Sequence, residues 1–341
     1  MKKNVFGVRN VFGYVHLKKI SEEEHMKMIS IIIPCYNEEE ALDIVYEAIV
    51  KEMEHLKGYD YELLLVNDGS SDFTLGKMRN LAEKNIHVKY YSFSRNFGKE
   101  AAIYAGFTNA TGDYVVMMDA DMQDPPALLS QMVKILEKGE YDCVATRRVT
   151  RTGEGAIRSL GARMFYKIIR KMTNINIADG ARDYQMMTRQ MVDSVLALTE
   201  YNRFSKGIFE WVGYRKTWLE FENIERAAGE TKWSFWKLLL YSLEGIINFS
   251  NIPLNISSYL GIGMTGLSFM AILFIIVRKL IFGDPVDGWA STVCIITFVG
   301  GIQLFCIGIM GQYMSKMYSE VKNRPRYIIQ ETNVKETKLN N

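Results

Sequence analysis

The length, composition and charge of the chain exclude several classes of protein. At 341 residues it can hold one large domain or two ordinary ones. Its formal net charge of +2, with 23% charged and 48% hydrophobic residues, excludes a disordered chain and lacks the basic surplus of a nucleic-acid-binding protein. Residues 1–25 form an N-terminal extension without the continuous apolar core of a signal peptide. The four cysteines show no paired spacing, so they predict neither disulfides nor a zinc site.

From residue 26 onward, apolar runs of strand length alternate with segments whose apolar residues recur at helical spacing. Asn37, followed by three glutamates, is expected to cap the first helix. This alternation predicts a mostly parallel, Rossmann-like α/β sheet with helices on both faces. The predicted strands are Met28–Pro34, Tyr61–Val66, Val88–Phe93, Asp113–Met118 and Asp142–Ala145, and the later helices are Phe73–Glu83, Glu100–Asn109 and Ala127–Glu137.

Polar residues follow three of these predicted strands at the point where each strand ends. They are residues 34–38, residues 67–70, and the pair Asp119 and Asp121. The carboxyl ends of parallel strands meet at one edge of a sheet, and ligands of such folds bind outside that edge. We therefore expect the three clusters to lie along one rim.

The acids Asp119, Asp121 and Asp124 lie within six positions directly after the fourth strand. Two interpretations are open at this point. Aspartates are common in turns because they hydrogen-bond their own backbone. Alternatively, a hard cation such as Mg²⁺ or Mn²⁺, which takes oxygen ligands, stabilises the cluster. Asp124 directly precedes Pro125 and is expected to cap the following helix.

Two long segments without charge lie in the C-terminal third. Residues 245–277 and 288–315 contain no charged residue for 33 and 28 positions. Each exceeds the roughly 20 apolar residues that cross a bilayer core. They predict a hairpin of two transmembrane helices, at about 259–280 and 289–312, within residues 257–315. The basic residues of the polar tail 316–341 place that end, and with it the N-terminal domain, on the cytoplasmic side of the membrane.

The segment directly before the first predicted span, residues 231–256, has apolar residues at helical spacing and two tryptophans, Trp233 and Trp236. A core helix is the plain interpretation of such a pattern. Its position next to a membrane span favours amphipathic helices that lie in the headgroup plane.

Seven stretches of the sequence together carry a family resemblance that covers roughly Lys27 to Arg326. The chain resembles the family 2 glycosyltransferases with the GT-A fold. Within that family it is similar to the polyprenyl-phosphate glycosyltransferases, namely dolichol-phosphate mannosyltransferases and, more closely, bacterial bactoprenol-phosphate glucosyltransferases. The stretches are PCYNEE, VNDGSSD, SRNFGKEAAIYAGF, DADMQDPP, DYQMMTR, RFSKGIFEWVG and RAAGETKWSFWKL.

The resemblance implies a GT-A domain at residues 26–230, a nucleotide-sugar donor (UDP-linked by expectation), Mg²⁺ or Mn²⁺, and a polyprenyl-phosphate acceptor. It also implies a bacterial cell membrane location, a homo-oligomer, specifically a tetramer, and no nucleic acid as partner. Carried over by position, Asp121 and Gln123 would face the metal and Asp183 would be catalytic together with Asp121. The residues implied for nucleotide-sugar binding are Pro34, Tyr36, Glu38, Asp68 and Asp119.

The acceptor phosphate requires cations, and guanidinium groups match phosphate oxygens well. The candidates are Arg147, Arg158, Arg226 and Lys232. A phosphate monoester has a second pKa of about 6 and is already ionised near neutral pH, so a strong general base is less necessary. Asp183 is therefore open to three interpretations: a proton acceptor, a residue that positions a substrate, or one half of a surface pair with Arg182.

Three functions remain to be weighed. The first is transfer of one sugar to polyprenyl phosphate with inversion at the anomeric carbon. The second is a processive polysaccharide synthase, which usually carries a Gln-x-x-Arg-Trp signature and more spans than this chain. The third is a non-catalytic membrane scaffold or flippase subunit with a degenerate transferase domain, against which the intact acids argue.

Overall fold

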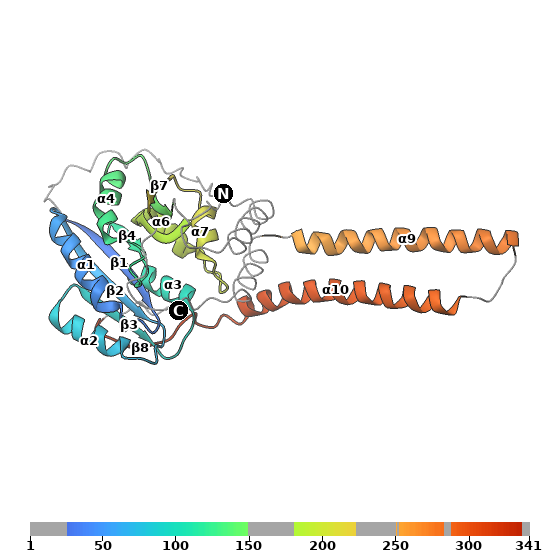
Figure 1. Cartoon of the computed structure of the whole chain (residues 1–341), viewed down its shortest axis with the longest axis horizontal. Helices are drawn as coiled ribbons and strands as arrows, with labels where there is room; N and C mark the ends of the chain where they lie inside the picture. Colours follow the sequence, from blue (N-terminus) through green and yellow to red (C-terminus); the bar gives the residue numbers. More distant parts are fainter. Residues whose placement is uncertain (1–25, 149–180, 223–249, 251, 283–287, 336–341) are drawn as a thin grey trace, which may run out of the picture.

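The computed structural model describes residues 26–148, 181–222, 250, 252–282 and 288–335 of the chain. In these residues, a sheet covered by helices is followed by two long helices that extend away from it (Figure 1). The sheet domain contains every described residue that we predicted for the site.

Eight strands form a single sheet in the order β7-β5-β6-β4-β1-β2-β3-β8. β6 and β8 run antiparallel to their neighbours, and the other strand pairs are parallel. The predicted mostly parallel sheet is thus confirmed, with two strands reversed. The strands are β1 (Lys27–Cys35), β2 (Tyr59–Asn67), β3 (Val88–Phe93), β4 (Tyr114–Met117), β5 (Cys143–Arg148), β6 (Ala181–Thr188), β7 (Lys216–Phe221) and β8 (Ile329–Thr332).

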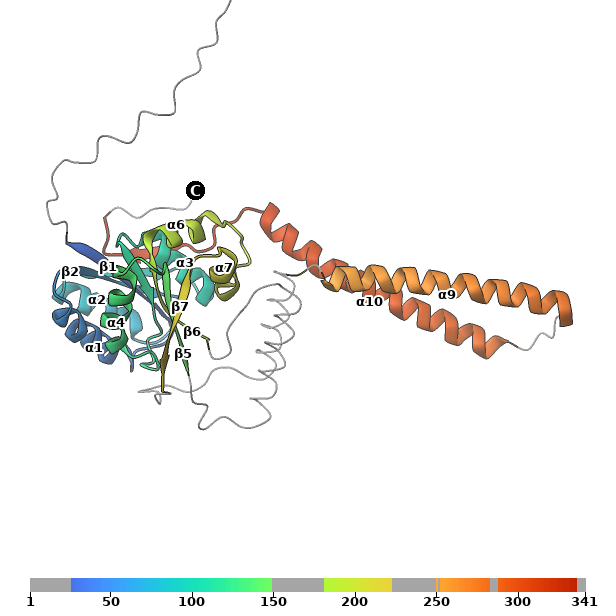
Figure 2. The same cartoon turned by 90° about the horizontal axis from the view of Figure 1, so that it is seen from above.

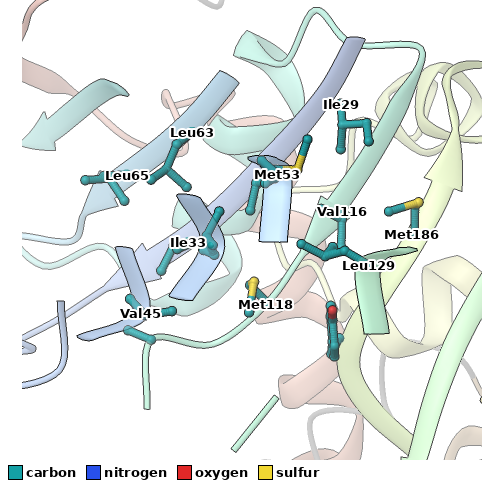
Figure 3. Close-up of a cluster of buried hydrophobic side chains, with 14 of the residues drawn as sticks. Ile29, Ile33, Val45, Met53, Leu63, Leu65, Val116, Met118, Leu129 and Met186 are labelled. Atoms are coloured by element: carbon teal, nitrogen blue, oxygen red, sulfur yellow. The ribbon is translucent and has the colours of Figure 1, made fainter. Parts of the chain in front are cut away.

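Helices cover both faces of this sheet, as its strands require. In β1, Ile29, Ile31 and Ile33 point to one face and Ile32 to the other, and all four are fully buried. The first face packs against α1 (Leu42–His55), α2 (Thr74–Lys84) and, after the short 3₁₀ helix η1 (Pro126–Leu128), α4 (Leu129–Glu137) (Figure 3). The second face packs against α3 (Lys99–Asn109), α6 (Arg189–Ala197) and α7 (Ser205–Trp211).

The predicted cap at Asn37 is wrong. α1 begins at Leu42, and its first turn has no side-chain cap. Asn37 adopts a left-handed backbone conformation with φ 55°, and its side-chain oxygen accepts hydrogen bonds from the next loop instead. The residues after β1 therefore form a structured turn before the helix starts.

The two long helices, α9 (Ile252–Phe282) and α10 (Trp289–Val321), lie side by side (Figures 1 and 2). Across their near ends, the Tyr313 hydroxyl donates to the Ser250 carbonyl at 2.5 Å. Among the described residues, one segment, Phe298–Val321 of α10, is long and apolar enough to cross a membrane. The structure thus offers one candidate span, and the two-span hairpin stays a prediction.

The C-terminal end of α10, here called its base, is bonded to the sheet domain. The Glu320 carboxylate accepts the backbone N–H of Tyr201 at 2.9 and 3.0 Å, and the Lys316 ammonium donates to the Asn202 side chain at 3.3 Å. Beyond α10, the Arg326 guanidinium donates to the carbonyl of Glu200 at 3.0 Å. The segment 199–202 is thereby held against the base of α10.

The predicted polar tail, residues 316–341, includes the last turn of α10 and then the edge strand β8. In β8, Glu331 forms a bidentate ion pair with Arg79 of α2 at 2.7 and 2.6 Å and accepts the Tyr90 hydroxyl at 2.8 Å. The chain that leaves α10 therefore returns to the sheet and pairs with β3. The predicted extension 1–25 and most of the predicted juxtamembrane segment 231–256 lie outside the described residues.

Candidate functional site

The loops after β1 and β2 interlock at the carboxyl ends of their strands. The Asn37 side-chain oxygen accepts the backbone N–H of Ser71 at 2.8 Å, and the Asn37 N–H donates to the Ser70 hydroxyl at 2.9 Å. The Glu39 carboxylate accepts the Phe73 N–H at 2.7 Å. Of the predicted nucleotide-binding residues, Tyr36, Glu38 and Asp68 lie on these two loops, and Pro34 lies near the end of β1. The Tyr36 side chain is exposed.

Asp68 holds a third loop against the first two. Its buried carboxylate accepts the backbone N–H groups of Phe97 at 2.6 Å and Gly98 at 2.9 Å. Burial raises the pKa of Asp68, and the two N–H groups partly oppose that rise. Gly69 makes this close approach possible, because its φ is +65° and a Cβ there would lie 2.4 Å from the backbone carbon of Arg95. The predicted role of Asp68 in nucleotide-sugar binding stays a prediction.

The acids that follow β4 do not point to one spot. Asp121 accepts the backbone N–H of Gln123 at 3.1 Å, across a turn in which Met122 has φ 59°. Asp124 instead turns inward and is fully buried. It accepts the Asp119 N–H at 3.2 Å and forms an ion pair with Arg182 of β6 at 2.9 Å.

The prediction that Asp124 caps the next helix is therefore wrong. Neither η1 nor α4 has a side-chain cap, and the Asp124 carboxylate lies beneath the loop. Burial raises its pKa to about 6, against the lowering effect of the Arg182 charge. The ion pair between Asp124 and Arg182 gives one of the three clustered acids a structural role. Through it, the loop that carries Asp119 and Asp121 is bonded to β6.

Asp183 reaches the same rim because β6 is antiparallel to β4. Met117 pairs with Gln185, so residue 183 falls level with residue 119, two positions past the end of β4. The Lys99 ammonium lies between the two carboxylates, 2.6 Å from Asp119 and 2.6 Å from Asp183. On the other side of Asp183 lies the ammonium of Lys206, at 3.3 Å. The order Asp119, Lys99, Asp183, Lys206 defines a charged row.

The electrostatics of this row bear on the three interpretations of Asp183. Burial alone would raise the pKa of Asp183, but the charges of Lys206 and Lys99 outweigh it and hold that pKa well below its usual range. Arg182, the predicted surface partner, is paired with Asp124 instead. The lowered pKa makes the ionised Asp183 carboxylate a weak proton acceptor, which favours a positioning role over proton abstraction.

Lys99 and Lys206 are the residues that sequence reasoning missed. Both lie in stretches that carry the family resemblance, SRNFGKEAAIYAGF and RFSKGIFEWVG. Lys99 opens α3, and Lys206 lies in the first turn of α7. Their position within those stretches is the one sequence signal that could have identified them as site residues. A lysine at the start of a helix does not by itself indicate a site. The neighbour of Lys99, Glu100, accepts the Ser205 N–H at 3.0 Å and so joins the starts of the two helices.

The donor set at the rim suits a hard divalent cation that is shared with a substrate. In the part of the chain that the structure describes, no three His, Cys, Asp or Glu side chains converge as a complete protein cage. Mg²⁺ is usually bound by one or two carboxylates together with water and substrate phosphates. Asp121, with the amide oxygen of Gln123 two residues on, fits that pattern.

The predicted acceptor-phosphate residues are only partly described. Arg147 lies on β5, where its guanidinium donates to the carboxylate of Glu220 on β7 at 2.9 Å. Arg158, Arg226 and Lys232 lie outside the described residues. The predicted phosphate site therefore stays a prediction.

A mostly parallel sheet with aspartates at its carboxyl rim is the architecture expected of a GT-A fold. Comparison with known proteins agrees: residues 30–196 match the model of glycosyl transferase family 2, and this chain belongs to that family. It is 43% identical over 307 residues to the putative glycosyltransferase CsbB of Bacillus subtilis (strain 168), covering 90% of this chain and 92% of that protein.

A second relative has a more specific name. The SfII prophage-derived bactoprenol glucosyl transferase of Shigella flexneri is 39% identical over 304 residues, covering 89% of this chain and 98% of the relative. Among solved structures, a glucosyl-3-phosphoglycerate synthase from Mycobacterium tuberculosis with Mn²⁺, UDP-glucose and phosphoglyceric acid matches with a TM-score of 0.46. That match has 20% identity over 65% of this chain and 78% of the other, which is too distant to say what this chain binds.

Proposed function

We propose that this protein transfers one sugar from a nucleotide-sugar donor, UDP-linked, to a polyprenyl phosphate at the cytoplasmic face of a bacterial membrane, with inversion at the anomeric carbon. The observation that carries the proposal is the charged row beside the Asp121 loop, at the rim of a domain that is attached to a long apolar helix. The name of the Shigella flexneri relative supports a bactoprenol-type acceptor.

The donor end of the site is assigned to the rim loops. Pro34, Tyr36, Glu38, Asp68 and Asp119 would hold the nucleoside. Asp121 and Gln123 would hold Mg²⁺ or Mn²⁺, which when bound neutralises the charge that develops on the departing diphosphate. The Lys99 ammonium bridges Asp119 and Asp183 and so holds the two carboxylates in a defined arrangement.

The acceptor end needs no strong base. A phosphate monoester is largely dianionic above its second pKa of about 6, so its oxygen attacks without first losing a proton to the protein. Asp183 has a pKa held well below the usual range, once the Lys206 and Lys99 charges have overcome the effect of burial. Its role in this proposal is to position and to stabilise positive charge at the sugar, and no proton is transferred to it.

Membrane attachment is assigned to α9 and α10 as a two-helix hairpin. Large apolar side chains on both helices are exposed, such as Ile262 and Phe269 on α9 and Leu304 on α10, with 70%, 70% and 72% of their surfaces accessible. Exposed apolar surface on this scale is stable when covered by lipid. The cations that follow the span favour a cytoplasmic domain. The tetramer implied by the resemblance is part of the same proposal.

The test uses membranes that contain the full chain, incubated with a panel of radiolabelled sugar nucleotides. We expect label from one donor to enter the lipid extract, to be lost on chelation, and to return with Mg²⁺ or Mn²⁺. Asp121→Asn should abolish the transfer in a folded, membrane-bound protein. Asp193→Asn is the matched control, because this aspartate lies on α6 with 61% of its side chain exposed. Undiminished labelling by Asp121→Asn would overturn the proposed site.

A further inference from the structure

Lys206 lies at the end of the charged row that is nearer to α7. Its ammonium is 3.3 Å from one carboxylate oxygen of Asp183, and Lys99 occupies the other oxygen at 2.6 Å. The Lys206 side chain is 28% exposed and that of Asp183 is 20% exposed. The pair is therefore partly buried, and part of each side chain remains accessible to solvent.

The element that carries Lys206 faces the membrane helices. Figures 1 and 2 show α7 on the side of the sheet domain from which α9 and α10 extend. The segment directly before α7 is bonded to the base of α10 through the Tyr201 N–H and the Glu320 carboxylate, at 2.9 and 3.0 Å. Lys206 thus lies four residues after Asn202, which belongs to the segment that is hydrogen-bonded to the candidate membrane span.

Three other described cations near the rim, like Lys206 itself, pair with carboxylates. Lys99 lies between Asp119 and Asp183, and the guanidinium of Arg182 pairs with buried Asp124 at 2.9 Å. Arg147, predicted for the acceptor phosphate, pairs with Glu220. Lys206 combines contact with Asp183 and a position on the membrane side of the domain.

We propose that Lys206 binds the phosphate group of the lipid acceptor and holds it beside Asp183 for attack on the sugar; this inference rests on the proposed function. A phosphate oxygen forms the new bond to the anomeric carbon. The bond from that carbon to the donor diphosphate breaks, and its electron pair leaves with the nucleoside diphosphate. No proton is exchanged with the protein in this step.

The charges of the row explain why a cation is needed at this point. Asp119 and Asp183 carry two negative charges, and Lys99 alone would leave the row with a net charge of −1. A phosphate with a charge of about −1.5 to −2 would then be repelled by Asp183. Lys206 makes the row neutral, so that the row as a whole no longer repels the phosphate.

The test measures transfer by the full-length protein in detergent, with separate KM values for the polyprenyl phosphate and for the nucleotide sugar. We expect Lys206→Met to raise the acceptor KM at least tenfold and to leave the donor KM within about twofold. Lys206→Arg, which keeps the charge, should recover most of the acceptor affinity. Lys206→Gln is measured alongside, so that an unfolded methionine variant does not decide the result.

The matched control is Lys216→Met. Lys216 of β7 also forms an ion pair with a carboxylate of α7, but with Glu210, at the other end of that helix. Its acceptor KM should equal that of the wild type. An unchanged acceptor KM in the Lys206 variants, or an equal rise in both KM values, would overturn the role of Lys206. If the wild type itself places no sugar on the lipid, the proposed function fails first, which is a distinguishable result.

Discussion

Arg182→Met tests the buried ion pair beneath the acidic loop. The variant leaves Asp124, which has no exposed surface, without the cation at 2.9 Å that compensates its charge. In the wild type, burial raises the Asp124 pKa to about 6 although Arg182 lowers it. Without Arg182 the pKa should rise to about 8 or above, as documented for buried carboxyl groups. The loss of stability should therefore depend on pH.

The direction and the size of this pH dependence follow from proton linkage. Because the folded pKa of Asp124 lies above its unfolded value, its contribution to stability falls as pH rises from the unfolded to the folded pKa. Below about pH 6 the group is protonated in both proteins, so the variant loses little. At pH 8, two pH units above 6, the variant should lose about 3 kcal/mol in free energy of unfolding, since each unit is worth about 1.4 kcal/mol. Breaking a buried pair typically costs a similar 3 to 5 kcal/mol.

The assay follows alkylation of the buried thiols of Cys35 and Cys143, with Cys294 and Cys306 replaced by alanine. Both thiols are buried in the sheet domain, so labelling reports its opening. Relative to the wild type at the same pH, the variant should be labelled about a hundredfold faster at pH 8 and nearly equally at pH 5. Equal ratios at both pH values, or a larger effect at pH 5, would refute the reasoning.

Two further predictions concern the rim. Gly69→Ala should weaken nucleotide-sugar binding, measured by calorimetry, because the new methyl group would lie 2.4 Å from the Arg95 backbone and displace the loop held by Asp68. Gly58→Ala, also at positive φ but with no atom within 4 Å, is its control, and equal donor affinity in the two variants would contradict this. Asp183→Asn should lower kcat about a hundredfold or more yet keep the acidic limb of its pH profile near 6, which belongs to the acceptor phosphate. Loss of that limb in the variant would show that Asp183 is the base.

The strands and the rim could be predicted because their signals are local. The five predicted strands appear within a few residues of their expected bounds, since strands buried on both faces are continuous apolar runs. The placement of residues 34–38, 67–70 and 119–121 along one edge followed from the rule for parallel sheets. The caps at Asn37 and Asp124 were predicted wrongly, because each side chain finds a partner that is distant in sequence: the loop after β2 for Asn37, and β6 for Asp124.

What the sequence determined by itself is the alternation of elements, the family, and the chemical types of residue at the rim. Only the tertiary structure decided which of those residues act together. Asp119 and Asp183 are level because β6 runs antiparallel to β4, a direction that no local pattern encodes. Lys99 and Lys206 come from two helices that pack on the same face of the sheet, and their charges keep Asp183 ionised. Electrostatic interactions depend on distance in space, so they appear only once the chain is folded.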